Sequence, residues 1–234
     1  MSFKYVISYD PVNIYALNGK LKKSIAKKGY ELIFKLRERL EYITSNSGLP
    51  YPPVTIIPET RLLIHEGGVT AVVYANINYR FSGGYIHPIV EMYLPFLLHA
   101  PAELQTLVLA HEFLHYMYLA LRYVSSDYLM NPLIYTGDLT GRSFLEDLYT
   151  VNPDRIFSNQ RFVNRINKIH EYLDKSKIGN DIQRKWIDRG YPSKSIFADD
   201  FRIKISMNMW TKMYFPEEVL RKARVLLGEK QRSL

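Results

Sequence analysis

The segment from Pro101 to Arg122, PAELQTLVLAHEFLHYMYLALR, limits what this chain can fold into more than any other segment. Pro101 suits the first position of a helix, and Glu103 follows in the first turn, where the helix dipole favours negative charge. From Leu107 to Leu121 the residues are apolar on almost every side, as they are in a helix that is buried all round. The sequence therefore predicts a long buried helix at the centre of the molecule.

Three ionisable side chains interrupt this apolar run: His111, Glu112 and His115. Burying a carboxylate and two imidazoles is costly unless they are paired or bind a metal. At about 100° per residue, the two histidines lie roughly 40° apart on one helix face and about 6 Å apart along the axis. They can bind one Zn²⁺, and Glu112, which points about 100° away from His111, can reach a water beside the metal. A chance match is the alternative, but it would more often fall on a solvated helix.

The run AELQTLVLAHEFLH is similar to the active-site helix of the zincin metallopeptidases, which commonly has an acidic start, an apolar run and then HExxH. Metzincins continue as HExxHxxGxxH, whereas this chain has Tyr118 and Leu121 at the Gly and third His positions. Peptide deformylases use a Cys ligand, and the chain has no Cys. The resemblance therefore implies the gluzincin type, in which a Glu on a second, downstream helix completes the site.

The resemblance also implies an activity and a cofactor. Three protein ligands leave one position of a catalytic Zn²⁺ to water, and the metal lowers the pKa of that water toward about 7. Glu112 then accepts the proton as general base and passes it to the departing amine. We therefore expect a zinc-dependent peptidase with one catalytic zinc, acting on a peptide or protein substrate.

The third ligand is expected within Thr140–Val151, TGRSFLEDLYTV, whose apolar residues form a helical stripe. Glu146 flanks that stripe and lies 31 positions after the second His of the motif, which leaves room for a loop and a returning helix. Asp147 is the nearest rival, and Asp138 is a weaker one. Many gluzincins carry an Asp four residues after the ligand Glu, where it orients a His ligand. This chain has Thr150 there, so either another carboxylate takes that role or Glu146 is not the ligand.

Zincins often use a His or Tyr from the lower lobe to stabilise the tetrahedral intermediate. His170 and Tyr149 are the candidates here, Tyr149 because it lies one turn from Glu146. The simpler interpretation is that His170 is an ordinary surface residue beside Glu171. The other histidines, His65, His87 and His99, are expected to be structural or exposed.

The rest of the pattern predicts an α+β fold in a single domain, 1–234. A short strand is expected at 3–9, a basic helix from 18 or 19 to about 46, and strands at 54–57, 61–65, 70–79 and 85–93. Further helices are expected at 156–173 and 216–227. The zincin resemblance implies that residues up to about 124 form an upper lobe with a small mixed sheet, and that about 125–234 form a mainly helical lower lobe.

The resemblance also implies where a substrate binds. In zincins the last strand before the active-site helix lies at the sheet edge and pairs with an extended substrate. Here that strand is Ile86–Leu94, and Pro88 near its start is compatible with an edge position.

The amino-acid composition limits the metals and partners that this chain can bind. The absence of cysteine excludes disulfides and thiolate-held metals, so zinc must use His, Asp or Glu. The N-terminus, MSFKYVISYD, lacks the apolar core of a signal peptide, and no stretch of about 20 apolar residues could span a membrane. We expect a cytoplasmic location and no membrane partner. The net charge is +8, but basic residues are scattered through 20–39, 161–177 and 221–232, which disfavours a nucleic-acid partner.

The contrary hypothesis is a basic, helix-rich nucleic-acid-binding or regulatory protein that retains an inactive or structural zincin metal site. Such a protein needs basic residues concentrated on one face. A peptidase that regulates by cleaving a partner protein would combine both features.

Overall fold

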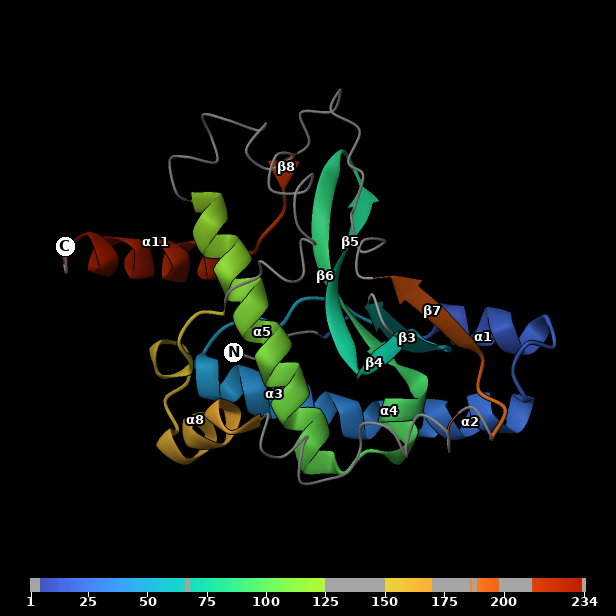
Figure 1. Ribbon diagram of the computed structural model, residues 1–234. Helices are drawn as coiled ribbons and strands as arrows, with labels where there is room; N and C mark the ends of the chain where they lie inside the picture. Colours follow the sequence, from blue (N-terminus) through green and yellow to red (C-terminus); the bar gives the residue numbers. More distant parts are fainter. Residues whose placement is uncertain are drawn as a thin grey trace.

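The computed structural model describes residues 5–65, 68–124, 150–169, 186, 189–197 and 212–232, which form an α+β fold (Figure 1). Along the chain, a short strand and three helices precede five strands, and two helices follow these strands. The remaining described residues add a 3-10 helix, a helix, two short strands and a last helix. The predicted fold class, α+β, is confirmed.

The N-terminal part contains β1 (Ile7–Ser8), then α1 (Asp10–Leu17), α2 (Lys23–Glu31) and α3 (Ile33–Ser47). The single helix expected from 18 or 19 to about 46 is therefore divided, and α1 precedes it. The division lies just after Gly29, which packs so closely against Tyr9 and Leu94 that a Cβ there would collide with both side chains. The N–H of Leu32 bonds to the Gly29 carbonyl at 3.1 Å, which closes a tight turn between α2 and α3.

The strands form two sheets. β2 (Val54–Ile57), β5 (Ala75–Ser82) and β6 (Tyr85–Tyr93) join β1 in the order β1-β2-β6-β5, and β8 (Lys212–Met213) also pairs with β6. Only β5 is antiparallel to its neighbour in this sheet. The second sheet has the order β4-β3-β7, from β3 (Thr60–His65), β4 (Gly68–Val73) and β7 (Ser193–Phe197). The strand expected at 70–79 is thus two strands, and the chain passes from one sheet to the other at Tyr74.

The expectation that Ile86–Leu94 forms the sheet edge is wrong. β6 is an interior strand, paired with β5 on one side and with β2 and β8 on the other, so that β5 is the edge strand among the described residues. Pro88 is tolerated because of where its nitrogen points. The N–H of Val90 donates to the Pro53 carbonyl just before β2, and the carbonyl of Ile86 accepts from the N–H of Tyr214 just after β8. The nitrogen of Pro88 therefore faces the gap between these two partners.

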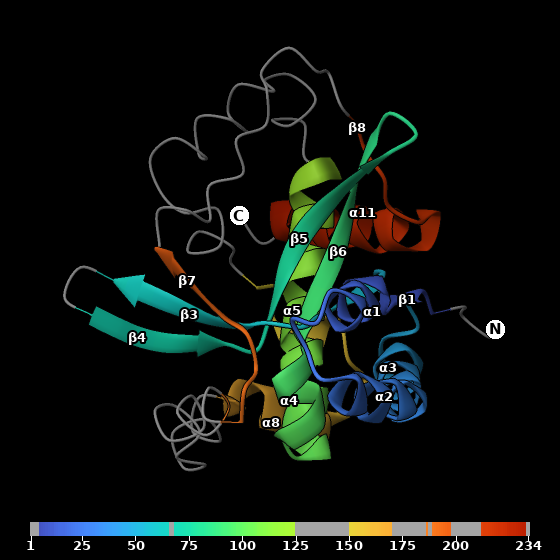
Figure 2. The ribbon, with the colours of Figure 1, turned by 90° about the vertical axis from the view of Figure 1, so that its right-hand side faces the viewer.

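The helix predicted at 101–122 is α5 (Ala102–Val124), preceded by the short α4 (Leu94–His99). α5 packs against β5, α3, α8 (Gln160–Asn167) and α11 (Glu217–Arg232). Figure 2 shows it running behind the β5–β6 hairpin. Its apolar residues are fully buried on successive turns, for example Leu107, Phe113 and Met117. The predicted helix is confirmed, but it is not buried on every side, because His111, His115 and Tyr118 on one face are partly exposed.

The C-terminal part contributes strands as well as helices. β7 and β8 pair with β3 and β6 respectively, and neither strand was expected from the sequence. The 3-10 helix η1 (Pro153–Arg155), α8 and α11 lie within or near the expected helical regions. Among the described helices, none combines the length and the apolar character that crossing a bilayer requires.

Candidate metal centre

The middle of α5 carries the HExxH residues, with Glu112 buried and both histidines partly exposed. The Nε2 atoms of His111 and His115 lie 3.0 Å apart. Their ring planes are inclined at 87°, and their centroids are 4.6 Å apart. The two imidazoles therefore converge on one point through the same type of nitrogen, as the spacing of four residues predicts.

This convergence fits a shared metal ion. Two nitrogens bound to one tetrahedral Zn²⁺ at the usual bond length lie about 3.3 Å apart, close to the observed 3.0 Å. The same spacing also suits a hydrogen bond from one neutral imidazole to the other. Within the described residues, no group of three or more His, Asp or Glu is placed to hold a metal, so the described part of the chain supplies two candidate ligands.

Glu112 is a buried carboxylic acid with only 7% of its surface exposed. Burial raises the pKa of Glu112 to about 8, and a hydrogen bond with the backbone of Ile77 acts in the opposite direction. None of the ion pairs within the described residues involves Glu112. A buried acid without a cationic partner favours its neutral form, whereas a cation nearby would favour the carboxylate.

The contact with Ile77 places Glu112 at the outer edge of β5. Ile77 lies opposite Val90 in the β5–β6 register, and the N–H of Val90 points to β2. In an antiparallel pair, the backbone groups of Ile77 therefore point away from β6, toward the free edge of the sheet. Sequence analysis missed this role of β5, because strand order depends on contacts between distant segments.

Two asparagines of β5 bind the backbone groups along the same edge. The Asn76 side chain donates to the Ile77 carbonyl at 3.2 Å, and the Asn78 side chain accepts from the Tyr79 N–H at 2.8 Å. Asn76 also accepts a bond from the Tyr93 hydroxyl at 2.7 Å. These contacts satisfy part of an edge that would otherwise be open to pairing with another strand.

Polar contacts from neighbouring elements hold α5 in position. The Gln105 amide donates to the carbonyls of Phe96, Leu97 and Ala100, which ties the end of α4 to the first turns of α5. The Tyr51 hydroxyl donates to the Leu109 carbonyl at 2.7 Å, two residues before the metal motif. Sequence reasoning did not identify either residue, because both act through contacts with segments distant in the sequence.

The expected third ligand, Glu146, and its rivals Asp147 and Asp138 lie outside the described residues, as do Tyr149 and His170. Thr150 is described and exposed. The next residue, Val151, is buried, and its N–H approaches the Leu114 carbonyl of α5 at 3.5 Å. The chain therefore returns to α5 beside His115, five residues after Glu146.

The remaining described histidines have contacts away from this centre. The His87 ring lies 3.1 Å from the Ser82 carbonyl, and His99 contacts Tyr191 and Arg189. For His65 only the backbone is described. A surface cavity of about 580 Å³ also lies elsewhere, and its lining includes Tyr15 and Glu59 but no residue of the HExxH motif.

No protein-family model matches the chain, and no curated protein or solved structure matches it either. The chemistry of the site must therefore be interpreted from its own geometry.

Proposed function

We propose that this chain is a zinc-dependent peptidase of the zincin type. His111 and His115 hold the zinc, a carboxylate from the segment 138–147 completes the protein ligands, and Glu146 is the first choice for it. Glu112 is the general base. The observation that carries the proposal is the convergence of the two Nε2 atoms, 3.0 Å apart, beside a buried acid that has no cationic partner among the described residues.

Zinc in this position supplies Lewis-acid chemistry: it makes a water more acidic and polarises a peptide carbonyl. The chain supplies the proton transfers. With the cation present, Glu112 is a carboxylate, accepts a proton from the attacking water and delivers it to the departing amine. The hydrogen bond from the Ile77 backbone holds this carboxylate against the outer edge of β5. Burial of Glu112 keeps it away from bulk water.

The substrate is proposed to pair with β5 in extended form, not with β6. The outward backbone groups of Ile77 lie next to Glu112, so a peptide strand along this edge passes the general base. Such a strand would displace the side-chain contacts that Asn76 and Asn78 make with neighbouring backbone groups. Main-chain pairing of this kind binds a peptide without requiring a particular sequence.

The test compares Glu112→Gln with the unchanged chain in zinc content and in cleavage of a mixed peptide library. Glu112→Gln should keep one equivalent of zinc and lose activity by about 10²–10⁴-fold, which is the usual contribution of a general base. Glu103→Gln is the matched control, because Glu103 lies on the same helix but is exposed and pairs with Arg165. Glu103→Gln should keep both the zinc and the peptidase activity. A chain that binds no zinc, or a Glu112→Gln variant with near-native turnover, would overturn the proposal.

A further inference from the structure

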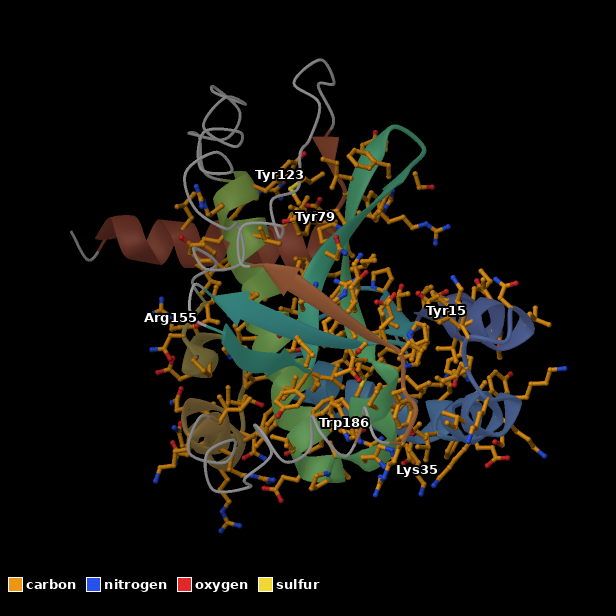
Figure 3. The ribbon with its side chains drawn as sticks, turned by 45° about the vertical axis from the view of Figure 1, so that its right-hand side comes forward. Tyr15, Lys35, Tyr79, Tyr123, Arg155 and Trp186 are labelled. Atoms are coloured by element: carbon orange, nitrogen blue, oxygen red, sulfur yellow. The ribbon has the colours of Figure 1, made fainter. Side chains whose placement is uncertain are left out.

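One end of the molecule is formed by α1, α2 and the loop between them, residues 18–22, which we call the helical hairpin. In Figure 1 the hairpin projects from the body, with its loop at the extremity, and Figure 2 shows the same end facing the viewer. Figure 3 places Tyr15 of α1 at this end as well. The hairpin lies on the opposite side of the sheet from α5, so its surface is separate from the candidate metal centre.

The outward face of α1 exposes aliphatic side chains. Leu17 is 78% exposed, more than any other large hydrophobic side chain among the described residues, and Ile14 is 53% exposed. Both point away from Val12, which is fully buried in the core. Tyr30, by contrast, packs against Tyr9 at the other end of α1. Neighbouring exposed aliphatic side chains such as Ile14 and Leu17 can mark an interaction site.

The hairpin also carries a positive charge. Residues 10–31 contain five lysines and two acidic residues, Asp10 and Glu31, so the hairpin has a net charge of +3. Lys20, Lys22 and Lys23, in and beside the loop, are all exposed. Ion pairs within the described residues involve none of these lysines. These three exposed lysines therefore follow directly after the exposed Leu17 at the end of α1.

We propose that the helical hairpin docks on the surface of an anionic lipid bilayer. Its lysines would meet the lipid phosphates, and Leu17 and Ile14 would enter the boundary between headgroups and acyl chains. The phosphates of a nucleic acid would pair with the lysines equally well, but a nucleic acid offers no apolar environment for two aliphatic side chains. Docking of this kind needs no spanning segment, and it is independent of the proposed peptidase chemistry.

The experiment measures co-sedimentation of the full chain with vesicles of phosphatidylcholine alone and with about 30% phosphatidylserine. Binding should require the anionic lipid and should fall steeply as salt is raised. The triple variant Lys20→Gln, Lys22→Gln, Lys23→Gln should bind about 100-fold more weakly, at about fivefold per lysine. Leu17→Ser should bind about tenfold more weakly, because it removes the inserted side chain.

Matched controls separate the hairpin from a general charge effect. The variant Arg161→Gln, Lys168→Gln, Arg221→Gln removes the same charge from exposed positions outside the hairpin, and Val225→Ser removes a half-exposed aliphatic residue from α11. Both should bind within about twofold of the unchanged chain. All variants alter exposed residues and should keep the same melting temperature.

Four results would overturn the proposal. The first is that the chain does not bind anionic vesicles at low salt. The second is that the control variants lose as much vesicle affinity as the hairpin variants. The third is a DNA duplex that competes with the vesicles and is bound through the same lysines with no contribution from Leu17. A dimer that dissociates in Leu17→Ser while vesicle binding is unchanged would likewise assign the apolar face to a second copy of the chain.

Discussion

Single residues show how burial decides protonation in this fold. Burial raises the pKa of Glu112 to about 8, while burial, Arg189 and Lys28 together lower the pKa of His99 to about 4. Both effects favour the neutral form of the side chain. Only Glu112 lies beside two potential metal ligands, so only there would a bound cation reverse the preference and produce the carboxylate that a general base requires.

His99 provides a test of pH dependence away from the metal centre. Its Nδ1 atom accepts a hydrogen bond from Arg189 at 3.0 Å, and its Nε2 atom lies 2.8 Å from the Tyr191 hydroxyl. Between pH 4 and 6.5 the unfolded chain holds a proton on this side chain that the folded chain does not, so the free energy of unfolding should fall as pH decreases through this range.

His99→Gln should remove that part of the pH dependence. Urea unfolding of both chains at intervals from about pH 4 to 7 checks this, because carboxylates that titrate in the same range cancel in the difference. The gap in unfolding free energy between the two chains should change steadily across the range. A gap that does not vary with pH would show that His99 is protonated equally in the folded and unfolded states.

Among the elements, α5 depends on its neighbours for the position of its motif. Most of the surface of this 23-residue helix is apolar and buried, so side-chain bonds from outside the helix help to fix its orientation. Gln105 does this at the N-terminal end, where its buried amide donates to three carbonyls at the end of α4. Tyr51 does the same at Leu109, two residues before His111.

Gln105→Met tests this anchor, since it keeps the side-chain length and removes the donor. It should lower the free energy of unfolding by about 1–3 kcal/mol, because buried carbonyls lose their partner. Thr106→Val is the control, since the Thr106 hydroxyl bonds to Ala102 within the same helix at an exposed position. It should change the free energy of unfolding by less than about 0.5 kcal/mol. Equal effects in thermal or urea unfolding would show that Gln105 is not an anchor.

The proposed third ligand, Glu146, lies outside the described residues, five positions before Val151, whose N–H approaches the Leu114 carbonyl of α5. Glu146→Ala should lose zinc outright, because removing one of three protein ligands weakens binding by orders of magnitude. Asp147→Ala should weaken zinc affinity by about 10–100-fold, as expected for a group that only orients a ligand. Zinc titration in competition with a chelator measures both. The reverse order would assign the ligand to Asp147, and no effect from either change would direct the test to Asp138.

For the molecule as a whole, we expect a bound zinc ion to contribute little to the stability of the fold. The core is built from apolar residues of both sheets and their helices, and the chain has no cysteine. Removing zinc with a chelator should therefore lower the melting temperature by only a few degrees, while reductant should have no effect. Calorimetry of the full chain with and without chelator checks this. Complete unfolding on chelation would indicate a structural zinc instead.

The amino-acid sequence by itself determined the features that depend on neighbours within a few residues. The bounds of β2 and β6 agree with the predicted strands, and α5 differs from the predicted helix by only one or two residues at its ends. The convergence of His111 and His115 also follows from the sequence, because residues four apart lie on one face of any helix. These properties follow from local backbone geometry, which can be predicted from the periodicity and spacing of residues along the sequence.

Only the tertiary structure decided which strand lies at the sheet edge and which side chains face each other across the fold. β6 was expected at the edge, but it pairs with β2 and with β8, and β8 lies more than 100 residues later in the chain. The contact of Glu112 with Ile77 has the same origin. Such arrangements depend on the packing of distant segments against one another, and no spacing along the sequence records that packing.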